Sequence, residues 1–97
     1  IAVNDFRRTL YHAFKEVDDA LSARVQLAEQ VQAREASLEA ASHSTRLYEV
    51  RYRAGAAPVR QWLDAKERER MAELALAQAR LQQLQVNMQL MQALGNG

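Results

Sequence analysis

Residues 51–65, RYRAGAAPVRQWLDA, contain the single Pro of the chain and the only Gly outside its C-terminal end. Gly55 can adopt the left-handed backbone conformation that ends a helix. Pro58 suits the first turn of a helix, because its fixed φ is helical and its missing N–H has no intrahelical partner there. Ala, Leu, Gln, Glu and Arg, all strong helix formers, dominate the flanking sequence. The sequence therefore predicts helices over about residues 3–54 and 58–94, joined by a turn at about 55–57.

Apolar residues recur every seven positions in both predicted helices, which is typical of a coiled-coil seam. In the first helix, the predicted seam is the column Val3, Leu10, Val17, Arg24, Val31, Leu38, Thr45 and Tyr52. In the second helix, the predicted seam is the column Leu63, Arg70, Ala77, Leu84 and Met91. A second apolar series lies roughly opposite and consists of Ala65, Ala72, Ala79, Val86 and Ala93. Two apolar faces on one helix predict two neighbours, which indicates a helix within a wall of helices.

The predicted fold is all-α, with one domain over residues 1–97 that forms a long antiparallel two-helix coiled-coil hairpin. At 1.5 Å per residue, the first helix is roughly 75–80 Å long and the second roughly 55 Å. The N-terminal end of the first helix is therefore expected to extend beyond the second. This end carries the aromatic residues Phe6, Tyr11 and Phe14, which would then have no partner in the second helix. We expect this apolar overhang to make the isolated fragment self-associate. Because the chain opens on Ile1 without a Met, we expect it to be an excised piece of a longer protein.

Composition argues against several classes of function. The formal net charge is +1, so no general attraction to nucleic acid is expected. The chain lacks Cys, and it has no run of 18 apolar residues that could span a membrane as a helix. His12 and His43 are separated by roughly 45 Å of predicted helix, so they cannot share a metal ion. No nucleophile elbow or phosphate loop is present. We therefore expect no enzymatic activity and no cofactor.

Arginine and aromatic residues gather around the predicted turn. They are Arg46, Tyr48, Arg51, Tyr52, Arg53, Arg60 and Trp62. This combination is typical of a protein-binding hot spot, although a nucleic-acid footprint or an ordinary well-capped turn would also account for it. Gln61 and Asp64 share one face in the first two turns of the second helix. The helix dipole alone favours an acid there by up to about 1 kcal/mol, which suffices for a structural explanation and does not exclude a pore-lining role.

Four motifs, taken in order, resemble the second-repeat hairpin of TolC-like outer membrane efflux proteins. They are FKEVDDAL at 14–21, RYRAG at 51–55, WLDA at 62–65 and the terminal ALGNG at 93–97. The resemblance implies a segment of a periplasmic α-barrel, in which three protomers with two hairpins each form a twelve-helix tunnel. It also implies that the full-length protein is a homotrimer in the outer membrane. Its implied partners are a periplasmic adaptor protein and, through the adaptor, an inner-membrane pump.

Motif position implies roles for individual residues. Tyr52 would belong to a tip network that holds the aperture closed, Asp64 to an acidic ring, and Gln61 stands where some members carry a second acid. Gly55 and Pro58 would form the turn. The candidate adaptor-docking residues are Arg51, Arg53, Arg60 and Trp62. The expected function is passive conduit formation and docking in a tripartite export system. The alternative is a free-standing coiled-coil interaction module, such as the hairpin of a periplasmic adaptor or a scaffold.

Overall fold

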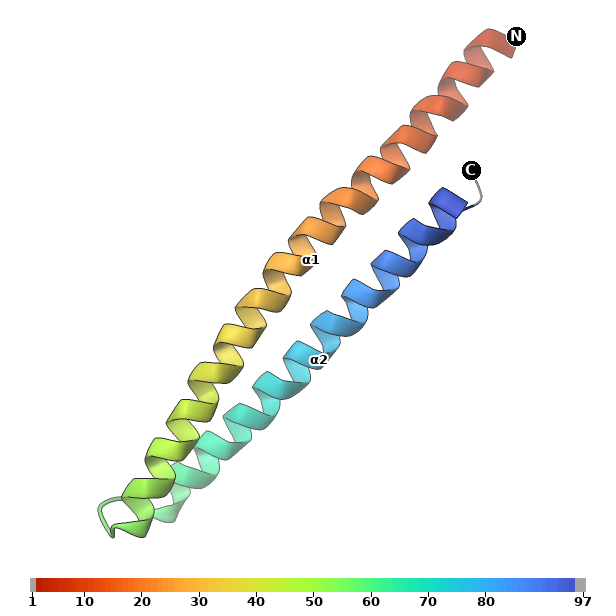
Figure 1. Cartoon of the computed structure of the whole chain (residues 1–97). Helices are drawn as coiled ribbons and strands as arrows, with labels where there is room; N and C mark the ends of the chain where they lie inside the picture. Colours follow the sequence, from red (N-terminus) through yellow and green to blue (C-terminus); the bar gives the residue numbers. More distant parts are fainter. Residues whose placement is uncertain (1, 96–97) are drawn as a thin grey trace.

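The computed structural model describes residues 2–95, so Ile1 and the Asn96-Gly97 end of the terminal motif lie outside it. It contains helix α1 (Ala2–Arg53) and helix α2 (Val59–Gly95). The two helices run antiparallel as a thin rod of 80 × 17 × 15 Å (Figure 1). The prediction of an all-α two-helix hairpin is confirmed. Neither helix, over the residues described, contains a segment long and apolar enough to cross a membrane.

The turn ends α1 through a pair of backbone hydrogen bonds. The amide of Gly55 donates to the carbonyl of Tyr52 at 3.0 Å, and the amide of Ala56 donates to the carbonyl of Arg51 at 2.8 Å. Gly55 has a φ of 77°, and it is the one described residue with a positive φ. This is a Schellman motif, in which a residue in the left-handed conformation satisfies the last carbonyls of a helix. The left-handed conformation of Gly55 therefore accounts for its expected role in ending α1.

The helix ends differ from the expected positions by one residue each. α1 ends at Arg53, because Ala54 already belongs to the turn. α2 begins at Val59, and the carbonyl of Pro58 accepts a hydrogen bond from the amide of Gln61 at 3.3 Å. Pro58 therefore caps the helix from just outside it. At the other end, Gly95 is the last residue of α2.

The interface between the helices uses the second apolar series of α2. The buried residues of α2 are Ala65 and Ala79, which belong to this series, and Leu76 and Leu90, which lie beside it on the same face. On α1 the buried residues are Val31 and Thr45, with Leu38 packed against the core. The Thr45 hydroxyl donates to the carbonyl of Ala41 at 3.0 Å, so this polar group is satisfied within the seam.

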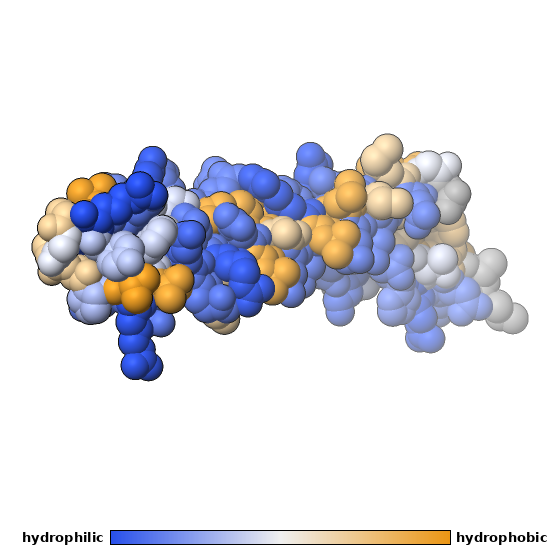
Figure 2. Space-filling model, turned by 90° about the horizontal axis from the view of Figure 1, so that it is seen from below, coloured by the Kyte–Doolittle hydropathy of each residue, from blue (hydrophilic) through white to orange (hydrophobic). Residues whose placement is uncertain are grey.

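The predicted seam of α2 was therefore wrong, whereas the column predicted for α1 supplies Val31 and Thr45. The Leu63 column, with the neighbouring column of Leu74, Leu81 and Met88, instead forms an outer stripe. Six of its large side chains are 54–72% exposed: Leu63, Leu74, Leu81, Leu84, Met88 and Met91. Ala79 and Leu76 of α2 pack with Val31 of α1, and Leu38 packs against the same cluster. Figure 2 shows hydrophobic patches reaching the surface between hydrophilic side chains along the rod.

An ion pair occupies two positions of the outer stripe. Arg70 donates to the Glu67 carboxylate from Nη2 at 2.6 Å and from Nε at 3.1 Å. This contact holds the pKa of the Glu67 carboxyl below its ordinary value, chiefly through the hydrogen bond. Both side chains are more than half exposed, so the pair contributes little to stability. It interrupts an otherwise apolar surface on α2.

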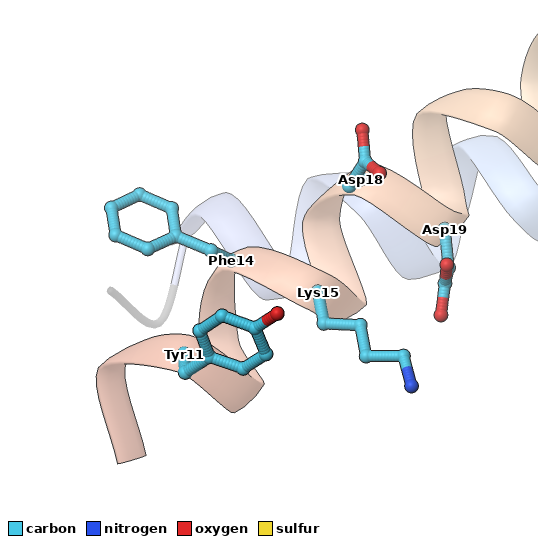
Figure 3. Close-up of a pocket in the computed structure, with 5 residues that line it drawn as sticks. All are labelled: Tyr11, Phe14, Lys15, Asp18 and Asp19. Carbon is cyan, nitrogen blue, oxygen red and sulfur yellow. The ribbon is translucent and has the colours of Figure 1, made fainter. Parts of the chain in front are cut away.

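The N-terminal part of α1 extends beyond the end of α2 (Figure 1). Its large apolar residues are 44–74% exposed: Val3, Phe6, Leu10, Tyr11 and Phe14. Figure 3 shows Tyr11 and Phe14 projecting from α1 beside Lys15, Asp18 and Asp19, and these five residues line a shallow pocket that belongs to α1 alone. Self-association through this overhang stays a prediction.

Replacing Gly55 with Ala should lower the free energy of unfolding by about 1 kcal/mol, because an L-residue in the left-handed region is strained. No atom lies within 4 Å of the added Cβ, so the cost is confined to the backbone. Gly95→Ala is the matched control, since Gly95 is helical and Ala is the better helix former. Thermal unfolding followed by circular dichroism measures both variants. Equal midpoints for the two would contradict the assigned strain.

Candidate functional site at the hairpin tip

Three side chains at the tip join the end of α1 to the start of α2. The rings of Tyr52 and Trp62 are stacked, with centroids 5.5 Å apart and an interplanar angle of 25°. The ammonium group of Lys66 lies 4.5 Å from the centroid of the Trp62 ring. Offset aromatic stacking contributes about 0.5–1.5 kcal/mol beyond area burial, and an exposed cation–π contact about 0.5–1 kcal/mol. The start of α2 is therefore held to α1 by more than backbone continuity.

The indole nitrogen of Trp62 carries an unusual cost. Nε1 is inaccessible to solvent and has no hydrogen-bond partner among the described residues. An unsatisfied buried donor typically costs about 1–3 kcal/mol, which is of the same size as the gain from the two ring contacts. The two ring contacts thus hold Trp62 in a position where its N–H lacks a hydrogen-bond acceptor.

The tip arginines differ in how they are held. The Arg51 guanidinium lies 5.8 Å from the centroid of the Tyr48 ring, and Arg53 forms a 2.9 Å salt bridge with Glu49. Both arginines lie in the last turn of α1, where the helix dipole favours positive charge. The Arg53 side chain is 72% exposed despite its ion pair. Arg60 is exposed in the first turn of α2. Positive charge therefore faces solvent from both helices at this end.

Gln61 and Asp64 are both exposed in the first two turns of α2. They lie three positions apart on a flank of the helix, whereas Trp62 and Ala65 face α1. Among the described residues, the aromatic partner of Tyr52 is Trp62, and Tyr52 remains 40% exposed. The structure therefore brings Tyr52 together with Trp62, a candidate docking residue, while the other two candidate aperture residues, Gln61 and Asp64, project separately from α2.

Sequence reasoning missed Lys66 as part of this cluster. Trp62 and Lys66 are four residues apart on one helix, which is the spacing at which side chains meet. The sequence itself carries that signal. Over residues 2–95, no group of three or more His, Cys, Asp or Glu side chains could hold a metal ion. The chemistry at the tip is therefore that of aromatic stacking, cation–π contact and surface charge.

The family model described as "Outer membrane efflux protein" matches residues 1–96, which includes both helices and the tip. The chain belongs to the outer membrane efflux protein family. Three relatives from Pseudomonas putida are each 39% identical over 97 residues. They are a probable efflux pump outer membrane protein TtgC, the antibiotic efflux pump outer membrane protein ArpC, and the toluene efflux pump outer membrane protein TtgC of a different strain.

The match to these efflux proteins covers 100% of the chain but only 20% of each relative. The hairpin therefore corresponds to about one fifth of each of these relatives. No solved structure matches the chain. The resemblance to the outer membrane efflux protein family that the sequence motifs indicated is confirmed.

Replacing Tyr52 with Ala should expose the indole of Trp62 and lower the stability of this efflux-protein hairpin by about 1 kcal/mol, because the stack is lost. Trp62 is the only Trp of the chain, so its fluorescence reports on the tip alone. We expect red-shifted emission and stronger quenching by acrylamide. Tyr11→Ala is the matched control, because Tyr11 is 74% exposed on the overhang. Unchanged emission in Tyr52→Ala would contradict the stacked arrangement.

Proposed function

We propose that the chain is the periplasmic, tunnel-forming segment of an outer membrane efflux channel within a tripartite export system. The observation that carries the proposal is the family match over residues 1–96, which spans the complete hairpin. The names of the relatives describe outer membrane components of efflux pumps, and one of them refers to toluene and another to an antibiotic. The proposed role is passive conduction of solutes, without catalysis.

The outer stripe of α2 supports assembly of such hairpins into a wall. Large apolar side chains such as Leu74, Leu81 and Leu84 are more than half exposed on the hairpin alone. Exposed apolar surface of this extent is typical of an interface. In the proposed homotrimer, a neighbouring helix covers this stripe, while the Ala65 series packs within the hairpin. The periplasmic location follows from the same proposal.

The residues at the tip form the turn and the aperture of the proposed channel. Gly55 and Pro58 form the turn, and Asp64 contributes a carboxylate to a ring at the constriction, with Gln61 beside it. Tyr52 takes part in closing the aperture. Its stack with Trp62 supports this role, because the contact ties the end of α1 to the first turns of α2. If the two helices splay apart at the tip, the Tyr52 and Trp62 rings must either separate or move together.

Docking of a periplasmic adaptor is assigned to the same end of the rod. Arg51, Arg53 and Arg60 present positive charge there, and arginine is enriched at the energetic centres of protein interfaces. Trp62 contributes its aromatic edge and positions Tyr52. We expect the adaptor surface to offer carboxylates or carbonyl oxygens, and we propose that the adaptor links the channel to an inner-membrane pump. A free-standing coiled-coil module is not favoured, because the family match extends over both helices.

Reversing the charge of the docking arginines should abolish export by the full-length protein. The triple variant Arg51→Glu, Arg53→Glu, Arg60→Glu replaces an attraction with a repulsion, so we expect efflux to fall to the level of a strain without the channel. The matched control changes the same three positions to Lys, which keeps the charge. Export of a toxic solute and cross-linking to the adaptor are the measurements. Undiminished export and cross-linking would contradict docking at the tip, whereas a wild-type channel that restores no export would contradict the efflux role.

A further inference from the structure

One flank of the hairpin carries a row of uncharged amides. A hollow of about 350 Å³ lies between the helices, and its polar lining residues are Gln26 and Gln30 of α1 and Gln82, Gln85 and Gln89 of α2. All five side chains are exposed. A second hollow of about 160 Å³ lies nearer the tip and is lined in part by Ser44, Tyr48 and Arg68. Both hollows are open depressions to which the two helices contribute side chains.

The two hollows lie on the same flank of the rod. In a coiled coil, residues separated by multiples of seven occupy equivalent positions around the helix. Gln30 and Ser44 are related in this way on α1, and Arg68, Gln82 and Gln89 are related in this way on α2. We call this surface the amide flank. Its members are Gln26, Gln30, Ser37, Ser44, Gln78, Gln82, Gln85, Gln89 and Gln92.

The amide flank is free of ionisable residues over most of its length. Its two columns on α2 contain Met, Gln or Ala at every position from 71 to 92, and those on α1 contain Ala, Gln or Ser at every position from 23 to 44. The opposite flank differs in kind. There Arg80 bridges to Glu35 across the two helices at 3.2 Å, and Glu73 stands one heptad away from Arg80. Between residues 71 and 92 of α2, charge is thus absent from the amide flank and present on the opposite flank.

Two of the three residues assigned to the aperture, Gln61 and Asp64, belong to the amide flank. Gln61 shares its column with Arg68, Gln82 and Gln89, and Asp64 shares its column with Gln78, Gln85 and Gln92. Beyond Arg68, the two columns that contain Gln61 and Asp64 carry only neutral side chains. A helix that contributes Asp64 to the mouth of a conduit must turn these glutamines toward the same space.

We propose that the amide flank lines the interior of the conduit. This lining suits small molecules that are uncharged, and amphipathic molecules of either charge. The inference rests on the proposed function. Glutamine amides offer two donors and one carbonyl acceptor without net charge, so they replace water contacts of a passing solute without retaining an ion. Charge selection is then confined to the tip, where Asp64, Arg68 and Arg51 lie. The opposite flank, which carries Glu73 and the Arg80–Glu35 ion pair and is called the charged flank, faces the outside of the wall.

Cysteine accessibility in the full-length channel tests this orientation. The chain contains no Cys, so Gln78→Cys and Gln85→Cys introduce single reactive sites into this segment of a channel freed of other cysteines. Glu73→Cys is the matched control, because Glu73 is equally exposed but lies on the charged flank. Each variant is recorded in a planar bilayer before and after a negatively charged methanethiosulfonate, with labelling verified by mass spectrometry.

We expect labelling at positions 78 and 85 to reduce the conductance and to shift the reversal potential toward cation preference. Labelling at position 73 should change neither. Block at position 73 without block at 78 and 85 would overturn the proposal, because the opposite flank would then line the conduit. Complete labelling with no change at 78 and 85 would also overturn it. A wild-type channel that conducts no ions would instead count against the proposed function, so the two failures are distinguishable.

Discussion

Replacing Leu76 with Ala will lower the free energy of unfolding of the hairpin by about 2–4 kcal/mol. Leu76 is 5% exposed and packs with Val31 and Ala79 in the core between the helices. Truncation removes buried apolar surface and leaves a cavity that two rigid helices cannot fill. Because a thin two-helix rod has little core, its total stability is only a few kcal/mol, and this single change is expected to unfold a large share of the molecules at about 25 °C.

Leu74→Ala is the matched control for that substitution. Leu74 lies two residues away on the same helix and undergoes the same chemical change, but it is 54% exposed on the outer stripe. Its loss should alter stability by less than about 1 kcal/mol. Urea unfolding followed by circular dichroism at low protein concentration compares the two variants without interference from self-association. A larger effect from Leu74→Ala than from Leu76→Ala would mean that the seam of α2 has been assigned to the wrong face.

The hairpin itself could be predicted from the sequence because few residues interrupt the helical pattern. Gly55 and Pro58 are the only helix-breaking residues between the two helices, so the position of the turn followed directly. The seam of α2 could not be chosen in the same way. Both the Leu63 series and the Ala65 series repeat every seven residues, and hydropathy favours the leucines. The structure buries Ala65 and Ala79 in the seam, where Ala79 packs with Val31, and small side chains at such positions let two helices lie close together.

At the tip, sequence reasoning found the residues but not their contacts. Arg51, Arg53, Tyr52 and Trp62 come together because all of them flank one short turn. The stacking of Tyr52 on Trp62 depends on side-chain rotamers across the turn, which a residue pattern does not specify. The amide flank is predictable from the sequence, since its glutamines recur at seven-residue spacing. It was overlooked because a polar column is ordinarily attributed to a solvated helix face.

Because the proposed role of Asp64 is to line the aperture, we expect that replacing it with Asn removes most of the cation preference of the full-length channel. Asp64 is exposed near the start of α2, on the amide flank. A cation about 4 Å from one carboxylate in water gains about 1 kcal/mol, which corresponds to a roughly fivefold enrichment, and symmetry-related copies add to it. Asn has nearly the same shape, so the fold and the width of the aperture should be retained. Gln61→Asn, a neutral change one turn away, is the matched control.

Single-channel recording of the full-length protein under a salt gradient tests the central claim that this hairpin lines an export conduit. The wild-type channel should conduct and should prefer cations, and the reversal potential of Asp64→Asn should move toward zero while that of Gln61→Asn stays unchanged. A full-length protein that forms no pore, or an Asp64→Asn channel whose reversal potential equals that of the wild type, would contradict the account.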